Sequence, residues 1–253
     1  GGRGMRGWRI LVTRPDAGSL TSRLRDRGAR PVVVPTIEIA ELAPGGGLDA
    51  AVRKLGGFDW IVVTSANGAR ALFRRLRALS ITPPEGPRWA AVGPATAAAL
   101  AAEGVRVERV PRAGTAAAVA RILGDLAGAR VLLPRARIAG WDLPSALTAR
   151  GALVVDVPAY DTVIGPESSR VPLAQALEGG LEAAIFTSGS TVQGFFRLAA
   201  DPRRALSTIL TVCIGHSTAR ALADMGVEAS AVAAAPSPTA IVEAIERVAH
   251  ARA

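Results

Sequence analysis

The chain has 253 residues, of which 49% are hydrophobic, and a formal net charge of +9 at pH 7. It contains one cysteine and two histidines, which excludes an internal disulfide and a structural zinc site. No apolar run reaches the roughly 18–20 residues that a membrane span requires. Residues 1–7 lack the apolar core of a secretory signal and are interpreted as a leader. We therefore expect a cytoplasmic protein, acting as a monomer, without membrane contact or bound metal.

Nearly all of the positive charge comes from arginine, since Lys54 is the only lysine. The planar arginine group binds carboxylates and phosphates through paired hydrogen bonds, although a codon bias explains the composition equally well. Basic proteins often bind nucleic acid, but the chain has no helix-turn-helix, zinc-finger spacing or basic-aromatic patch. We expect no nucleic acid partner. The positive charge is compatible with a small polyanionic ligand.

Short apolar runs alternate with helical patterns along the whole chain. In chain order, strands are expected at 8–12, 31–34, 60–63, 89–92, 105–110, 129–133, 153–157, 184–187, 211–214 and 227–233. Helices are expected around 20–24, 48–55, 69–76, 94–103, 115–123, 143–149, 192–199, 216–225 and 239–248. Pro35 and Pro158 are expected to close strands, and extended segments follow them at 36–39 and 159–162. Such alternation predicts an α/β fold with parallel sheets and helices on both faces.

The two halves of the chain repeat one another. Buried strand 60–63 is followed by apolar residues at helical spacing, namely Ala69, Leu72, Phe73 and Leu76. The same spacing returns 123 positions later (192 − 69) in Val192, Phe195, Phe196 and Ala199. This duplication allows two divisions of the chain. Each half can form a domain, or the chain can change domain at the extended segments after the two prolines, which would then pair as a two-stranded linker.

Small polar residues lie where several strands become helices. Thr64-Ser65 and Thr187-Ser188 end buried strands, and Gly93-x-x-Thr96 and Gly215-x-x-Thr218 begin two further helices. Helix starts leave backbone N–H groups unsatisfied, and these groups suit an anionic oxygen. These four strand-to-helix junctions, which we call corners, would line a cleft at the carboxyl ends of parallel strands. Taken alone, each serine is as often only a helix N-cap.

Tyr160 is the only tyrosine and lies in one of the extended segments. A phenol at this position can donate a proton or a hydrogen bond into the cleft, and a packing role is the equal alternative. His216 is expected to be exposed at a helix start, and Cys213 is expected to be a core residue.

Six motifs in order resemble those of the uroporphyrinogen-III synthase family, over about residues 10–245. They are Val12-Thr13-Arg14-Pro15, Thr64-Ser65-Ala66-Asn67-Gly68, Val92-Gly93-x-x-Thr96-Ala97, Pro158-Ala159-Tyr160-Asp161-Thr162, Phe186-Thr187-Ser188 and Ile214-Gly215-x-x-Thr218-Ala219. The resemblance implies two similar α/β domains, each a parallel sheet flanked by helices, joined by a two-stranded linker. Domain 1 would contain residues 8–34 and 164–253, domain 2 residues 41–156, and the linker residues 35–40 and 157–163.

The resemblance also implies cyclisation of hydroxymethylbilane, a linear tetrapyrrole, to uroporphyrinogen III without a cofactor or metal. In the family's scheme the substrate loses its terminal hydroxyl to give an azafulvene. The last pyrrole then attacks through its substituted carbon, and the spiro intermediate fragments and recloses with that ring inverted.

By the same resemblance, Tyr160 is the catalytic candidate that assists departure of the hydroxyl. The expected substrate-binding residues, which would face a polycarboxylate, are Arg14, Ser65, Asn67, Thr96, Arg135, Arg137, Ser188, Gly189, Ser190, Gly215 and Thr218. One alternative is a non-catalytic regulatory or ligand-sensing protein with the same fold, and another is a two-lobed solute-binding protein.

Overall fold

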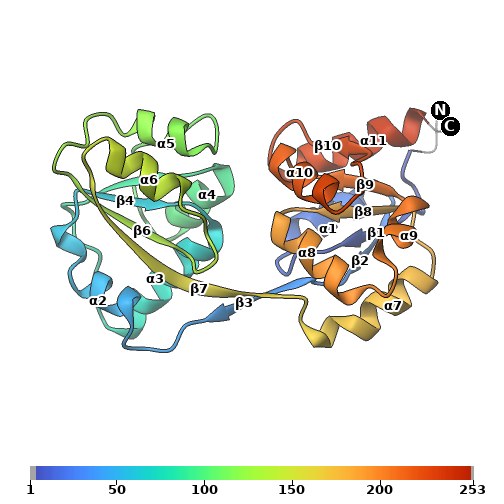
Figure 1. Cartoon of the computed structure of the whole chain (residues 1–253), viewed down its shortest axis with the longest axis horizontal. Helices are drawn as coiled ribbons and strands as arrows, with labels where there is room; N and C mark the ends of the chain where they lie inside the picture. The colour runs from blue at the N-terminus through green and yellow to red at the C-terminus, as the bar shows by residue number, and fades with distance from the viewer. Residues whose placement is uncertain (1–3, 252–253) are drawn as a thin grey trace. The chain divides into compact units, whose positions relative to one another are not determined.

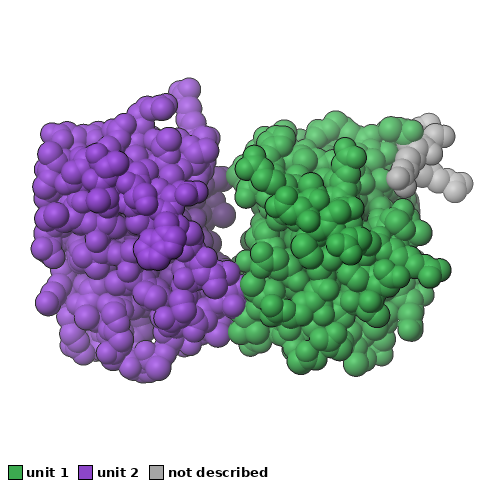
Figure 2. All heavy atoms as spheres, in the orientation of Figure 1, with its two compact units in different colours: residues 1–38, 163–253 green, residues 39–162 purple. Residues whose placement is uncertain are grey.

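The computed structural model describes residues 4–251 and divides into two compact units (Figures 1 and 2). Unit 1 takes in the described parts of Gly1–Glu38 and Val163–Ala253, and unit 2 is Ile39–Thr162. Residues 1–3 of the expected leader and residues 252–253 of the expected domain 1 lie outside the described residues. Within residues 4–251, none of the helices has the length and apolarity needed to traverse a bilayer.

Unit 1 is built on a parallel sheet with the strand order β10-β9-β8-β1-β2. Its strands are β1 (Arg9–Val12), β2 (Arg30–Val33), β8 (Ala183–Phe186), β9 (Leu210–Cys213) and β10 (Ala231–Val232). Its helices are α1 (Gly18–Asp26), α7 (Arg170–Glu178), α8 (Gly189–Leu198), α9 (Pro202–Ser207), α10 (His216–Asp224) and α11 (Pro238–Ala251), with a 3-10 turn, η2 (Glu167–Ser169). Alternate residues of β1 bury opposite faces: Ile10 packs in the core that contains α1 and α11, and Leu11 in the core that contains α8.

Unit 2 repeats this plan with the strand order β3-β7-β6-β4-β5. Its strands are β3 (Ile37–Glu41), β4 (Trp60–Val63), β5 (Arg88–Ala91), β6 (Arg130–Ala136) and β7 (Leu153–Ile164). Its helices are α2 (Gly47–Arg53), α3 (Ala66–Ala78), α4 (Pro94–Ala102), α5 (Ala116–Ile122) and α6 (Asp142–Ala149), with a 3-10 turn, η1 (Leu55–Gly57). The pairs β4–β5, β4–β6 and β6–β7 are parallel. The predicted α/β class, with mainly parallel sheets flanked by helices, is confirmed.

The boundary between the two units falls within β3 and within β7, which are neighbours in one sheet. Pro158 was expected to close a strand, but β7 runs through it for 12 residues. The pairing with β6 shifts register here, because Arg135 lies opposite Pro158 and Ala136 opposite Tyr160. A proline has no N–H to donate, and an irregularity in the ladder accommodates it. Strand β6 likewise continues to Ala136, beyond its expected end at Leu133.

Further segments differ from expectation. The strand expected at 227–233 is limited to β10, and helices α7 and α9 were not expected. The strand expected at 105–110 is reduced to one bridge, between Ala90 and Arg109, because charged residues alternate along this sheet edge and blunt its pairing. Met5, within the expected leader, is buried in a core of unit 1, and Gly7 N–H donates to the Gly28 carbonyl oxygen at 2.8 Å. Residues 5–7 are therefore part of the folded unit.

Candidate functional site

The carboxyl end of β4 carries the corner that the sequence singled out. Ser65 is the N-cap of α3, and its Oγ accepts a hydrogen bond from the Gly68 N–H at 2.9 Å. The hydroxyl of Tyr160, on β7, lies 2.9 Å from the same Oγ. The structure thus brings together two of the predicted site residues that are 95 positions apart in the chain.

Tyr160 packs in the core of unit 2 and also makes a hydrogen bond with its hydroxyl. Its side chain is 6% exposed and packs in an apolar core with Leu72 of α3. Its hydroxyl nevertheless reaches Ser65, and its backbone carbonyl accepts a hydrogen bond from the Arg137 N–H at 3.0 Å. The ring is therefore fixed by packing while its polar end lies at the start of a helix.

Gly68 allows this corner to form. A Cβ at this position would lie 3.0 Å from the Pro134 carbonyl oxygen and 3.2 Å from Ser65 Oγ. Any larger residue here would push the first turn of α3 and β6 apart by a few tenths of an ångström. The glycine in the motif Thr64-Ser65-Ala66-Asn67-Gly68 thus has a packing reason, and Asn67 beside it accepts a hydrogen bond from Arg70 at 3.1 Å.

Unit 1 has an equivalent corner after β8. Ser188 caps α8, and its Oγ accepts from the Thr191 N–H at 3.0 Å. Thr191 Oγ1 in return accepts from the Ser188 N–H at 3.2 Å, which completes a capping box. Gly189 and Ser190 are half-buried in the first turn of this helix. The two serines of the repeat therefore occupy the same structural position.

The two Gly-x-x-Thr corners also occupy equivalent positions. Thr96 and Thr218 are the third residues of α4 and α10, and both side chains are buried. The N-caps of these helices are Gly93, which has a φ of +92°, and Gly215. Glycine has no side chain that could accept a hydrogen bond from the first turn. The N–H groups at the starts of α4 and α10 are therefore available to other acceptors.

The predicted arginines have different environments. Arg135 is buried, and it donates to Asp156 through Nε at 3.0 Å and through Nη2 at 2.6 Å. Arg137 is exposed and donates from Nε to Asp161 at 2.6 Å. Arg14 follows β1 and is half-buried. Asp156 and Asp161 were not expected as partners of these arginines, because nothing in their spacing marks them as such.

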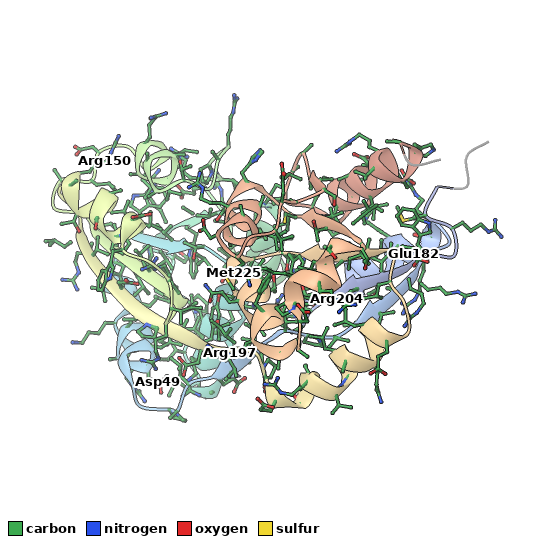
Figure 3. The ribbon with its side chains drawn as sticks, turned by 45° about the vertical axis from the view of Figure 1, so that its right-hand side comes forward. Asp49, Arg150, Glu182, Arg197, Arg204 and Met225 are labelled. Atoms are coloured by element: carbon green, nitrogen blue, oxygen red, sulfur yellow. The ribbon has the colours of Figure 1, made fainter. Side chains whose placement is uncertain are left out.

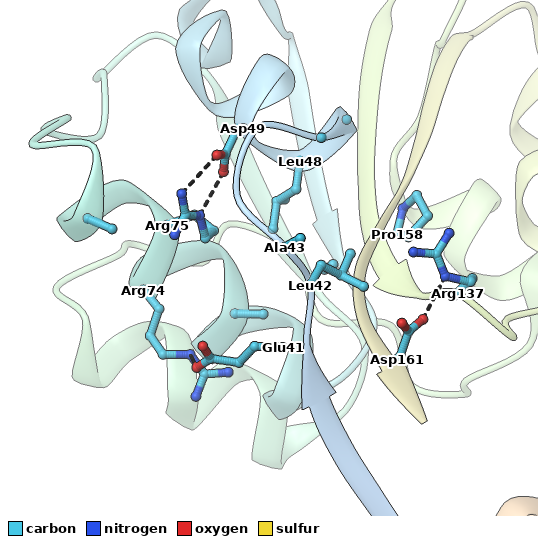
Figure 4. Close-up of a pocket in the computed structure, with 15 residues that line it drawn as sticks. Glu41, Leu42, Ala43, Leu48, Asp49, Arg74, Arg75, Arg137, Pro158 and Asp161 are labelled. Carbon is cyan, nitrogen blue, oxygen red and sulfur yellow. Dashed lines mark hydrogen bonds and ion pairs between the residues drawn. The ribbon is translucent and has the colours of Figure 1, made fainter. Parts of the chain in front are cut away.

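A cavity of about 800 Å³ lies within unit 2, beside α2 and α3 (Figure 4). Three ion pairs line it, and they are Arg74–Glu41, Arg75–Asp49 and Arg137–Asp161. The hydrogen bonds from Arg75 hold the pKa of Asp49 below its ordinary value. Sequence reasoning missed this cavity. The three arginines of this cavity are already paired with carboxylates, whereas the glycine-capped starts of α4 and α10 have no side-chain cap.

Cys213 and His216, the two other residues considered from the sequence, point to no specific role. Burial raises the pKa of the Cys213 thiol to about 11, so it stays protonated in the core, and His216 is exposed at the start of α10. Charged side chains are spread over both units, with Arg150, Arg197 and Arg204 among those on view (Figure 3). The predicted residues of unit 1 gather at the ends of its own strands, and those of unit 2 at the ends of theirs.

Comparison with known proteins identifies the family of this chain. The family model described as uroporphyrinogen-III synthase HemD matches residues 18–243. A uroporphyrinogen-III synthase from Synechococcus elongatus is 33% identical over 222 residues, which are 83% of each chain. A porphyrin biosynthesis protein HemD from Ruminiclostridium josui is 32% identical over 221 residues, covering 85% of this chain and 44% of that one. A crystal structure of mutant uroporphyrinogen III synthase from Thermus thermophilus, 22% identical, shares the fold with a TM-score of 0.69 over 97% of this chain and all of that one.

The repeated sheets, with hydroxyl-bearing residues where their strands lead into helices and a tyrosine beside one of them, define a two-unit α/β protein. The match over residues 18–243 makes the family plain. The chain belongs to the uroporphyrinogen-III synthase family, and the resemblance noted in the sequence is confirmed.

Proposed function

We propose that this chain converts hydroxymethylbilane to uroporphyrinogen III, with inversion of the last pyrrole ring. Family membership supports the reaction. The observation that supports assigning it to particular residues is the contact between the Tyr160 hydroxyl and Ser65 Oγ at 2.9 Å. This pair lies at the carboxyl end of a parallel strand, where α/β proteins bind their ligands.

Tyr160 assists departure of the substrate's hydroxyl in this proposal. Ser65 Oγ already accepts the Gly68 N–H, so the serine hydrogen can be donated to the tyrosine oxygen. The tyrosine hydrogen is then available to the leaving hydroxyl. As the C–O bond breaks, the hydroxyl takes up the tyrosine proton and leaves as water. The adjoining pyrrole gives up its N–H proton to become the azafulvene, and that proton balances the one that the tyrosine donated. A hydrogen bond from Ser65 stabilises the negative charge that develops on the tyrosine oxygen.

The carboxylates of the substrate are assigned to helix starts and arginines. The glycine-capped starts of α4 and α10, with Thr96 and Thr218, offer backbone N–H groups to carboxylate oxygens. Asn67, Ser188, Gly189 and Ser190 stand at the starts of the other two helices. Arg14 and Arg137 supply cationic groups, and Arg137 binds a substrate carboxylate by exchanging it for Asp161.

The expected domain organisation is part of the proposal. Residues 35–40 and 157–163 form a two-stranded linker between domain 1 (8–34 and 164–253) and domain 2 (41–156), and the unit boundary within β3 and β7 supports this division. A cytoplasmic monomer acting on a free polycarboxylate, without nucleic acid, completes the proposed description.

Product analysis tests the function. Purified protein is mixed with fresh hydroxymethylbilane, the reaction is stopped, and the oxidised porphyrins are separated by isomer. The proposal predicts the asymmetric III isomer, formed faster than the symmetrical I isomer that arises spontaneously. Only the I isomer, at the rate seen without protein, would leave the regulatory alternative in its place.

A further inference from the structure

The segment that follows β6 exposes two large apolar side chains. Trp141 is 79% exposed, the highest value among the large hydrophobic residues from 4 to 251, and Ile138 in the same segment is 52% exposed. Trp60 and Trp89 of the same unit, in contrast, are buried in its cores. Two such side chains three residues apart therefore form a small apolar surface, which we call the 138/141 surface.

Three hydrogen bonds fix the backbone of this segment. The Arg137 N–H donates to the Tyr160 carbonyl oxygen at 3.0 Å, and the Ala139 N–H donates to the Ala136 carbonyl oxygen at 3.0 Å. Farther along, Nη2 of Arg135 donates to the Gly140 carbonyl oxygen at 3.0 Å. These hydrogen bonds fix the backbone that carries Ile138 and Trp141.

Arg135 owes its own position to Asp156. Its side chain is only 7% exposed, and both Nε and Nη2 donate to the two oxygens of this carboxylate. A guanidinium buried in this way has its charge matched inside the protein. Its remaining bond to Gly140 makes it an anchor for the exposed segment. The sequence predicted a direct substrate contact for Arg135. Its hydrogen bonds to Asp156 and Gly140 instead favour a positioning role.

The segment lies at the same edge of the sheet as the Ser65 corner. Strand β6 pairs with β4 in parallel, with Val131 opposite Trp60, and it continues past the level at which β4 ends. The Pro134 carbonyl oxygen closely faces Gly68, the residue that donates to Ser65. The 138/141 surface therefore follows directly on the strand that abuts the Tyr160–Ser65 pair.

We propose that Ile138 and Trp141 form the contact surface for the face of one pyrrole ring of the linear tetrapyrrole, with Arg135 as the residue that positions it. This inference rests on the proposed function. Pyrrole rings are flat and electron-rich, and an indole stacks on such rings in offset or edge-to-face geometry. The ring carries acidic side chains, and Arg137 of the same segment supplies a cation for one of them.

Steady-state kinetics with fresh hydroxymethylbilane test the contact. Trp141→Ala is expected to raise KM about fivefold to tenfold, the loss of one aromatic contact, while Trp141→Phe stays within about twofold of the parent. Leu153→Ala is the matched control, because Leu153 is 58% exposed at the start of β7, the opposite edge of the sheet. Unchanged KM in Trp141→Ala would overturn the proposal.

A binding measurement separates this inference from the proposed reaction. Uroporphyrinogen III added without oxygen is expected to quench tryptophan emission in the parent protein, and Trp141→Phe is expected to lose most of that quenching. Equal quenching in both proteins would overturn the contact even if the III isomer is formed. If Trp141→Ala instead alters the sedimentation coefficient at unchanged KM, the surface joins two copies of the chain and the proposal is wrong.

The positioning role of Arg135 has its own readout. Arg135→Gln, or Asp156→Asn where the former folds poorly, is expected to raise KM in the parent but to add little in the Trp141→Ala background. Additive effects on KM would show that Arg135 acts independently of Trp141.

Discussion

The hydroxyl of Tyr160 and Oγ of Ser65 lie 2.9 Å apart, although one residue is on β7 and the other caps α3. Ser65 Oγ also accepts the Gly68 N–H, so this hydroxyl both completes a helix cap and touches the catalytic candidate. Because the cap holds the serine oxygen, the position of the tyrosine hydroxyl is fixed before substrate arrives. A preorganised hydrogen bond of this kind supports charge that develops during the reaction.

Tyr160→Phe is predicted to slow turnover several-fold without unfolding the protein. The ring keeps its packing in the core, and Ser65 keeps the Gly68 N–H, so the thermal midpoint should change little. The loss falls on kcat because the leaving hydroxyl no longer receives a proton or hydrogen bond. Unchanged kinetics in a stopped assay with fresh hydroxymethylbilane would remove Tyr160 from the mechanism.

Ser188→Ala is predicted to destabilise unit 1 by about 1 kcal/mol, because the capping box loses the bond from the Thr191 N–H. Chemical denaturation followed by circular dichroism measures the change. Ser190→Ala, in the first turn of the same helix, is the matched control and should cost less. Equal stability of both variants and the parent would show that the cap is not used.

Gly194→Ala is predicted to destabilise unit 1 by about 3 kcal/mol or more. A Cβ at this position in α8 would lie 1.8 Å from the Thr36 carbonyl oxygen, so the helix or that backbone must move. Gly18→Ala, at the start of α1, meets no atom within 4 Å and serves as the control. A Gly194→Ala protein with the parent's denaturation midpoint would contradict the close packing described here.

Asp49→Asn is predicted to lower stability in a pH-dependent way. The two hydrogen bonds from Arg75, at 2.7 and 2.8 Å, lower the pKa of Asp49 in the folded protein. The carboxylate therefore contributes stability above its unfolded pKa of about 4, and that stability is lost as pH falls through the lowered folded pKa. Urea denaturation should separate variant and parent at pH 7, and the gap should shrink in strong acid. A gap that stays constant down to strong acid would refute the assignment.

Much of the fold follows from local patterns. Strand β4 is apolar on both faces, and the 123-residue spacing to the second copy of its helix led to the paired caps Ser65 and Ser188 (188 − 65). Local chemistry sufficed there because strand, cap and amphipathic helix all lie within one continuous stretch, residues 60–78.

Other features depend on contacts that are distant in the chain. Strand β7 passes through Pro158 because a register shift against β6 accommodates the missing N–H, and no local signal announces this pairing. Arg135 has a buried partner, Asp156, that is 21 positions away, so the sequence identified its charge without identifying its role. Helix α7, with Pro172 in its first turn, was not anticipated at all.

The inversion of the last ring is tested most directly by isotopic labelling. Hydroxymethylbilane is prepared with carbon-13 in the methylene that joins the last two rings and in the unsubstituted α-carbon of the last ring. Inversion bonds these two carbons to each other, so the product of the enzymatic reaction should show one-bond coupling between the labels in its NMR spectrum. A cyclic product formed at the enzymatic rate without that coupling would contradict the account.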